Sequence, residues 1–523
     1  MGKKDKNKKK VSGIDKTAMK TEKKLTAKQK KELAALGEDD IEKVVAEIER
    51  EEAKRQRVVE AVVAPPSHRV NFSLTTHPFK DELVMLGGEF YNGQTTLVYG
   101  DMFFYNISNN EWSVIKAPGG PAPRCGHQAL AVPINKGQLW VFGGEYSSPS
   151  QSQFYHYRDL WVYHFGDKKW EKIGATGGPS ARSGHRMVYM KKQLFIFGGF
   201  HDNVRDYKYF NDVFVFNLTT YKWNKLEPSG TPPAPRSGCV VLPTPDNKIL
   251  VYGGYSKERI KKDVDKGHVH TDMFLLSPEK NDQTGLKWKW TLLKQSGISI
   301  SPRCSATAIL AQSNLAYMFG GVFDEEENEE DLKGTFFNDL IALDLEKYQW
   351  RTVTLSGKKN PQERRKRRKQ KEDGDINEES SDNDDSSDHE VPKAMDVTSE
   401  PTIVSDGIFT VTVGPSSMTN STIKEEKRPD DIFSPSPRIN PGLAIKHGVL
   451  YLFGGMFEDG DRQYTLNDFY KLDFRKLDEW KTIIKSDITS QTWIDSESSE
   501  SESQGEESTS DGSSENEMEV DEN

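Results

Sequence analysis

Short apolar runs that end in a pair of glycines recur six times along the chain. Each run holds four or five residues, rich in β-branched and aromatic types, which is the pattern of a buried strand bounded by a turn. In the third repeat the pattern predicts four strands, at about 184–189, 193–197, 212–217 and 222–226. Four short strands per repeat are typical of a β-propeller blade. The glycine pairs are Gly87–Gly88, Gly143–Gly144, Gly198–Gly199, Gly253–Gly254, Gly320–Gly321 and Gly454–Gly455.

Three further residue types accompany every glycine pair in the same order. An arginine stands 16 to 19 residues before the pair, an aspartate opens the next apolar run, and a tryptophan follows. We expect the arginines and aspartates in loops at opposite strand ends, bonding backbone groups of neighbouring turns. The tryptophans should lie between blades, because they offer a large apolar face. The arginines are Arg69, Arg124, Arg182, Arg236, Arg303 and Arg438; the aspartates are Asp101, Asp159, Asp212, Asp272, Asp339 and Asp468; the tryptophans are Trp112, Trp170, Trp223, Trp290, Trp350 and Trp480.

This repeated unit resembles the kelch repeat over about residues 62–485, apart from two insertions. The resemblance implies an all-β fold, a six-bladed kelch propeller with four antiparallel strands per blade, and no enzymatic activity. No further Pro-Arg unit follows Trp480, so each blade is expected to come from one continuous segment. The ring would then close through side-chain packing between blades six and one.

Composition shows that the propeller does not fill the chain. Of 523 residues only 34% are hydrophobic and 29% are charged, so part of the chain cannot form a core. We expect a disordered Lys-rich head at 1–38, the propeller at 63–485, and a disordered acidic, Ser-rich tail at 486–523. A disordered charged insert is expected at about 357–434, between blades five and six, and an acidic loop at 324–331 in blade five.

Two parts of these flanking segments have the pattern of regular structure. A helix is expected over 39–62, because Ile41, Val44, Val45 and Ile48 fall at helical spacing behind a capping aspartate. It would lie against its own propeller or bind a partner. Within the insert, 402–404 and 408–411 have strand character, which predicts a hairpin or a segment docked on the propeller.

The three cysteines, Cys125, Cys239 and Cys304, are too few for a disulfide framework and fit a reducing compartment. No apolar run follows the basic N-terminus, and no stretch of about 18 apolar residues occurs. The sequence therefore predicts a monomer in the nucleus or cytoplasm, neither secreted nor bound to a membrane.

The charged segments carry a candidate nuclear import signal and candidate phosphorylation sites. A basic run in the insert matches a nuclear import signal, and the basic head could hold RNA phosphates. Four serines have an acidic residue three positions on and suit an acidophilic kinase. For both, the alternative is a solvated segment without a dedicated partner. The basic run is Arg364, Arg365, Lys366, Arg367, Arg368 and Lys369, and the serines are Ser381, Ser387, Ser499 and Ser503.

Histidine chemistry does not converge on a catalytic or metal site. His127 and His185 occupy one repeat position, where blade four has Cys239, and a position that accepts His or Cys indicates packing. His268 and His270 lie in a polar loop, and no cluster of carboxylates or cysteines converges on them. No nucleophile elbow or phosphate-binding loop is present. We therefore expect no enzyme activity, no metal and no cofactor.

The loops after the glycine pairs are the candidate binding face, since they should gather on one side of the ring. Aromatic and basic residues are frequent there and are typical of interface anchors. Their charge suggests an acidic partner peptide, or the chain's own acidic insert; alternatively, the loops pack on each other. We expect a scaffold for a protein or ribonucleoprotein partner, or else a substrate receptor of a cullin-type ubiquitin ligase. The face comprises Tyr146, Tyr155, His156, Tyr157, His201, Arg205, Tyr207, Tyr209, Lys257, Arg259, Lys261, Lys262, Phe457 and Arg462.

Overall fold

The computed structural model describes the blades, one helix segment before them and a few residues after them. By internal contacts the chain forms two compact units, Met1–Thr354 with Ser434–Asn523, and Leu355–Phe433. The expected head, most of the insert, and most of the tail, with the basic run 364–369 and the four candidate phosphoserines, lie outside the described residues. The described residues are 39–202, 206–261, 264–311, 314–326, 332–357, 402–405, 410–413, 432–460, 462–488, 491 and 493–494.

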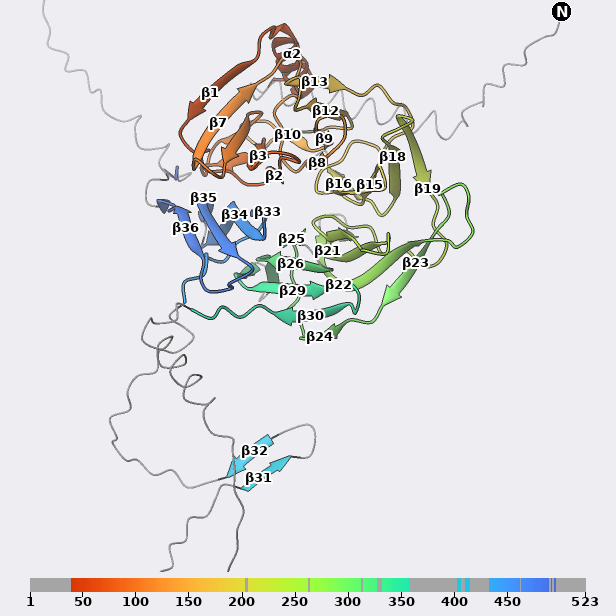
Figure 1. The fold of residues 1–523 in the computed structure, drawn as a ribbon, viewed down its shortest axis with the longest axis vertical. Helices are drawn as coiled ribbons and strands as arrows, with labels where there is room; N and C mark the ends of the chain where they lie inside the picture. Colours follow the sequence, from red (N-terminus) through yellow and green to blue (C-terminus); the bar gives the residue numbers. More distant parts are fainter. Residues whose placement is uncertain are drawn as a thin grey trace, which may run out of the picture. The chain divides into compact units, whose positions relative to one another are not determined.

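The first unit is a propeller of six blades arranged around a central axis (Figure 1). Each blade is an antiparallel sheet of four consecutive main strands, which confirms the predicted fold class. In the third blade the observed strands agree with the predicted ones to within about two residues, as expected for element ends. In blades one to three the strands are β2 (Ser73–Thr76), β3 (Glu82–Leu86), β6 (Met102–Asn106) and β7 (Glu111–Lys116); β8 (Gln128–Val132), β9 (Gln138–Phe142), β12 (Leu160–His164) and β13 (Lys169–Lys172); and β14 (Arg186–Met190), β15 (Gln193–Phe197), β18 (Val213–Asn217) and β19 (Lys222–Leu226).

Blades four to six repeat this order, and in two of them the middle strands continue beyond the sheet as a long hairpin. A short strand, β24 (Ser296–Gly297), adds to blade five in parallel with the outer strand. The main strands are β20 (Val240–Pro243), β21 (Ile249–Lys261), β22 (Val264–Pro278) and β23 (Trp288–Leu293); β25 (Thr307–Leu310), β26 (Leu315–Phe319), β29 (Leu340–Asp344) and β30 (Gln349–Thr352); and β33 (Gly442–Lys446), β34 (Val449–Asp459), β35 (Arg462–Asp473) and β36 (Lys481–Ile484).

Every glycine pair is followed by a β-hairpin rather than an irregular loop. In blades four and six this hairpin is the extension of β21–β22 and of β34–β35. In the other blades it is a separate two-stranded sheet. These separate hairpins are β4 (Glu89–Tyr91) with β5 (Thr96–Val98), β10 (Glu145–Ser147) with β11 (Phe154–His156), β16 (Phe200–Asp202) with β17 (Tyr207–Tyr209), and β27 (Val322–Glu326) with β28 (Leu332–Phe336). We call the side of the ring that carries all six the hairpin face.

The helix before the propeller is shorter than the sequence predicts. Helix α2 spans Ile41–Lys54, and the Asp40 carboxylate caps it by accepting a hydrogen bond from the Glu42 N–H at 3.1 Å. The prediction that it continues to residue 62 was wrong, because Val59–Val63 form strand β1, antiparallel to β7 at the outer edge of blade one. This segment is rich in valine, which favours an extended backbone, and β7 offers it an unpaired edge.

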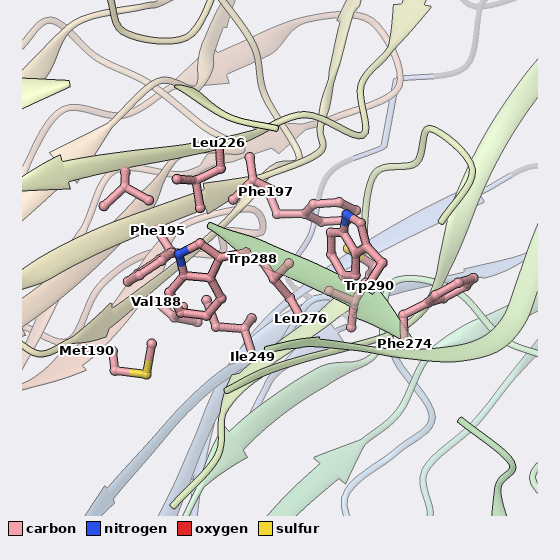
Figure 2. Packing of buried hydrophobic residues seen from close by; sticks show 14 residues of the cluster. Val188, Met190, Phe195, Phe197, Leu226, Ile249, Phe274, Leu276, Trp288 and Trp290 are labelled. Atoms are coloured by element: carbon pink, nitrogen blue, oxygen red, sulfur yellow. The ribbon is translucent and has the colours of Figure 1, made fainter. Parts of the chain in front are cut away.

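The core lies between the blades, and the repeated tryptophans supply much of it. Trp290 of blade four contacts Phe197 of blade three, with ring centroids 5.7 Å apart. Figure 2 shows this cluster, in which Trp288 and Trp290 lie beside Phe195 and Phe197 of the preceding blade. Trp350 and Trp480 contact the preceding blade in the same way. The predicted position of these tryptophans between blades is confirmed.

Six residues form a belt around the propeller axis at the hairpin face, and backbone hydrogen bonds join neighbouring members at four of the six steps. Its members stand two residues after each repeated arginine, and all have positive φ, from 46° to 60°. The N–H of Gly184 donates to the carbonyl of Gly126, and the N–H of Gly238 donates to that of Gly184, both at 3.0 Å. Glycine tolerates this conformation best, and asparagine better than most other residues. The six members are Asn71, Gly126, Gly184, Gly238, Ser305 and Asn440.

The ring closes without a strand shared between blades. The inner strands contact one another in the order β2, β8, β14, β20, β25, β33 and back to β2. At the seam between blades six and one, the Asn440 amide donates to the Asn71 side-chain oxygen at 2.9 Å. Among the described residues no strand after Trp480 joins blade one, as the sequence predicts.

A short segment after the last strand adds to this seam. The Ile494 N–H donates to the Asn92 carbonyl of blade one at 3.0 Å, and the Trp493 ring lies edge-on to Tyr91 at 5.7 Å. The side-chain amide of Gln491 donates to the Thr465 carbonyl of blade six. The predicted start of the tail at 486 was therefore too early. We call Ile488, Gln491, Trp493 and Ile494 the C-terminal clasp.

In the second unit the described part of the insert is a hairpin. Strand β31 (Thr402–Ser405) pairs antiparallel with β32 (Thr410–Val413), in register from Thr402 opposite Val413. This agrees with the hairpin alternative for these residues.

Candidate protein-interaction face

Six arginine–aspartate pairs support the hairpin face. The prediction that these residues lie at opposite strand ends was wrong, because each arginine binds the aspartate of its own blade. The first and third strands of a blade run in the same direction. The arginine before the first strand and the aspartate before the third strand therefore lie at the same end of the sheet. In each pair Nη1 also donates to the carbonyl of the first glycine, as in Arg124 to Gly143 at 3.1 Å. The pairs are Arg69–Asp101 (2.7 Å), Arg124–Asp159 (2.8 Å), Arg182–Asp212 (2.6 Å), Arg236–Asp272 (2.5 Å), Arg303–Asp339 and Arg438–Asp468 (2.6 Å).

The glycine pairs of blades one, two, three and five connect the base of the hairpin to the arginine of the following blade. The Gly144 N–H donates to the carbonyl of Arg182 at 3.0 Å, and the Arg182 N–H donates to Tyr157 O at 3.1 Å. Gly143 has φ 64°, and a Cβ there would lie 2.7 Å from the Arg182 carbonyl oxygen. The glycine pair is therefore required by close approach of the next blade as well as by conformation. As a result, the bases of these hairpins are held against the next blade.

In blade two the predicted binding tyrosines are covered by α2. Tyr157 and His156 are buried, and Tyr146 and Tyr155 are half-buried against the helix. Ile41 and Val45 pack into this cluster, while the side chain of Gln153 accepts from the Ile41 N–H at 3.2 Å and donates to Asp39 O at 2.7 Å. The assignment of these tyrosines to an open partner face is corrected, since the apolar stripe of the helix occupies them.

An uncharged polar cluster lies at the inner edge of the blade-two hairpin. His156 Nδ1 lies 3.3 Å from a Glu145 carboxyl oxygen, and the Ser183 hydroxyl donates to the same carboxyl at 2.9 Å. Burial lowers the pKa of His156 to about 3 and raises the pKa of Glu145 to about 8. Near pH 7 both groups are therefore neutral, and their contact is not an ion pair. His201 packs against His156 with ring centroids 4.6 Å apart and the rings tilted by 42°, so it also belongs to this interior cluster.

The hairpins of blades three and four form one connected surface. The Tyr207 hydroxyl donates to Asp265 at 2.8 Å, and Arg259 reaches both Asp265 and Asp206, at 3.2 and 3.4 Å. Tyr209 lies edge-on to Tyr255 across the same boundary. The structure thus brings together Tyr207, Tyr209 and Arg259 from the predicted set.

Three exposed side chains project from the blade-four hairpin beside these contacts. Lys257 and Lys261 are exposed, and Ile260 between them is 55% exposed. Sequence reasoning named the two lysines and missed the isoleucine, whose exposure depends on which side of the hairpin it faces. Lys262 and Arg205 lie outside the described residues.

Blade six contributes separately. Phe457 is half-buried and stacks on Tyr464 at 5.1 Å, while Arg462 is exposed at the start of β35. These residues are closer in the ring to blade one, where the C-terminal clasp lies, than to the lysines of blade four. The predicted set is thus distributed over the face rather than gathered at one point.

The hairpin face is less basic than the sequence suggests. Carboxylates on the hairpins of blades one, two, five and six have a raised pKa, in each case first because of burial. Exposed basic side chains are most frequent on the blade-four hairpin, but others stand on the hairpins of blades three, five and six, at Lys208, Lys333 and Arg462. These acids are Glu89, Glu145, Asp324 and Glu458. Asp324 was predicted within the acidic loop of blade five, whereas the other three were missed. Glu89 and Glu145 stand directly after a glycine pair, where the other blades have apolar or aromatic residues.

In the part of the chain that the structure describes, no group of three or more His, Cys, Asp or Glu side chains is placed to hold a metal ion. Within the same residues, no helix has the length and apolar character needed to cross a bilayer.

The repeated arginine–aspartate pairs, the glycine pairs and the continuous four-stranded blades together define a kelch-type β-propeller. The chain matches the family described as the KLHDC2/KLHL20/DRC7 Kelch-repeats domain over residues 67–287 and 179–369. It belongs to the kelch-repeat family.

Curated relatives share this region rather than the whole chain. Host cell factor of Drosophila melanogaster is 26% identical over 298 residues, which is 53% of this chain and 18% of that protein. Human host cell factor 1 is 28% identical over 301 residues, 53% of this chain and 13% of that protein. The N-(sulfonatooxy)prop-2-enimidothioate sulfolyase of Thlaspi arvense is 25% identical over 288 residues, 52% of this chain and 75% of that protein. The chain thus spans less than a fifth of the host cell factors that it matches.

A solved structure entitled "Structure of YjhT" aligns with a TM-score of 0.46 and 14% identity, over 80% of this chain and 98% of that chain.

Proposed function

We propose that the protein is a non-enzymatic interaction scaffold that binds an acidic segment of a protein partner on the hairpins of blades three and four. The cross-blade contacts of Tyr207 with Asp265 and of Arg259 with Asp206 carry this proposal, because they join two hairpins into one surface. Beside it, Lys257 and Lys261 supply positive charge and Ile260 supplies an exposed apolar contact. Such a combination of aromatic, cationic and apolar groups on a rigid base suits protein recognition.

The test is co-purification from cells with the double variant Lys257→Glu/Lys261→Glu. Loss of the main partner is expected, because two attractive charges become repulsive. The matched control is Lys191→Glu/Lys192→Glu, which makes the same change at exposed lysines in the β14–β15 turn, at the opposite end of the strands. An unchanged partner list for the first variant, or equal losses in both, would contradict the proposal.

The finer assignments are also proposals. Within the kelch family we propose similarity to kelch domain-containing protein 4, supported by the Lys-rich head, the acidic tail and the run from Gly253 to His270. We propose a nuclear or cytoplasmic location, with import through 364–369, and a monomeric state. Binding of RNA by the head stays a prediction. Recovery of cullin subunits with the wild-type chain would instead favour the ubiquitin-ligase alternative.

A further inference from the structure

A cavity of about 600 Å³ runs along the axis of the propeller. The six inner strands line it from the belt at the hairpin face to their far ends, and most of the lining is uncharged. A cavity of this size accommodates a side chain or a short peptide end rather than a folded domain. The charged groups that line it therefore decide what it can bind.

Arg186 places a guanidinium in this lining. It is the first residue of β14, two residues after the belt glycine Gly184. At the same position the other five blades have uncharged residues, so the positive charge comes from one blade only. These residues are Ser73, Gln128, Val240, Thr307 and Gly442.

The guanidinium of Arg186 is poorly satisfied by the protein. Its Nη1 donates to the carbonyl of its neighbour His185 at 3.2 Å, and among the described residues it makes no ion pair. A guanidinium has five N–H donors, and the arginines paired with aspartates show how this fold satisfies them elsewhere. Burial lowers the pKa of Arg186, which is the expected effect on a cation without a compensating anion.

We propose that Arg186 makes the axial cavity a binding site for a carboxylate, either that of an acidic side chain or that of a peptide C-terminus. A carboxylate matches the planar fork of a guanidinium and can accept two parallel hydrogen bonds from it. At the mouth, Asn71, Ser183 and Asn440 line the same cavity, but their side chains already bond Glu89, Glu145 and each other. Arg186 is therefore the group that would hold the carboxylate. The first residues of two hairpins, Glu145 and Phe200, also line this cavity. The residues that carry the proposed surface on blades three and four do not line it, so the two sites can be tested separately; they are Tyr207, Lys257, Arg259 and Lys261.

The test compares the full-length wild type with Arg186→Gln and Arg186→Lys by thermal unfolding at constant ionic strength. The probes are N-acetylglycine, which has only a terminal carboxylate, and N-acetylglutamic acid amide, which has only a side-chain carboxylate. N-acetylglycine amide is the neutral control. We expect a saturable rise in the melting temperature of the wild type with at least one acidic probe, weakened about tenfold or more in Arg186→Gln, because a charge-assisted bidentate contact is lost. The probe that acts identifies the source of the carboxylate.

Without a probe, Arg186→Gln is expected to melt at or above the wild-type temperature, since it removes an uncompensated charge. Arg186→Lys should keep part of the response because it keeps the charge. Equal responses of the wild type and Arg186→Gln, or no response of the wild type to either acidic probe, would overturn the proposal. Neither result bears on the Lys257 and Lys261 experiment.

Discussion

Arg438 and Asp468 form the most enclosed of the six arginine–aspartate pairs. Two parallel hydrogen bonds of 2.6 and 2.8 Å join the side chains, which are 0% and 3% exposed. Asp468→Ala should destabilise the protein by about 3–5 kcal/mol, because it leaves a buried guanidinium unpaired.

The matched control is Asp339→Ala in blade five, where the aspartate is 42% exposed and water can replace it. We expect a loss of about 1 kcal/mol or less for that change. Urea unfolding of both variants measures the difference. Equal losses would show that enclosure does not determine the strength of these pairs.

The C-terminal clasp should stabilise the seam between blades six and one. Trp493→Ala removes the ring that contacts Tyr91, and we expect a loss of about 1–3 kcal/mol. A chain shortened to end at Ile494 should melt like the full chain, whereas one shortened to end at Lys485 should melt at a lower temperature. If both shortened chains melt alike, the clasp does not support the seam.

Helix α2 should be detachable from the hairpin of blade two. Val45 is 2% exposed, so Val45→Asp would bury a charge in an apolar cluster and favour release of the helix. Hydrogen exchange of residues 145–157 should then accelerate, because Tyr155 and Tyr157 lose their cover. Lys43→Asp, on the exposed side of the same helix, should leave that exchange unchanged. Slow exchange in Val45→Asp would show that the hairpin is stable without α2.

Stability should fall as the pH rises from neutral, and Glu145 should contribute to this fall. Its pKa is about 8 in the folded protein, against about 4.3 for a solvated glutamate, so between these values the folded state keeps a proton that the unfolded state releases. This contribution is fully present below about pH 4 and decreases by up to about 1.4 kcal/mol per pH unit until pH 8.

Glu145→Gln should therefore flatten the fall in melting temperature between pH 6.5 and 8.5 and raise stability at the upper end. The pKa of His156 is lowered, so its effect has the opposite direction and is lost as the pH falls below about 6.5, outside this range. Glu111→Gln, at an exposed site, is the control. An unchanged slope in Glu145→Gln would show that this carboxyl is ionised in the folded protein.

The fold could be predicted because each blade repeats the same local signals. Glycine pairs, tryptophans and apolar runs make their contacts within one blade or with the next blade. They therefore recur in every repeat and can be recognised from the sequence. The β1 strand could not be predicted in this way, because Val59–Val63 depend on the free edge of β7, which is distant in sequence. Trp493 was missed for the same reason: its partner Tyr91 belongs to the other end of the chain.

The candidate face was predicted less completely than the fold. Its location followed from the repeat, but exposure depends on which side chains the neighbouring hairpins and α2 cover. The sequence placed Tyr157 and Lys257 on the same binding face, but Tyr157 is buried and Lys257 is exposed. Nothing in the sequence singles out Arg186, because the cavity that it lines exists only in the assembled ring.

The seam between blades six and one joins two blades that are each complete in one stretch of chain. The ring itself therefore does not require the chain ends to lie at this particular seam. A circularly permuted protein, with residues 39 and 494 linked and new ends placed between Trp223 and Arg236, should assemble the same ring.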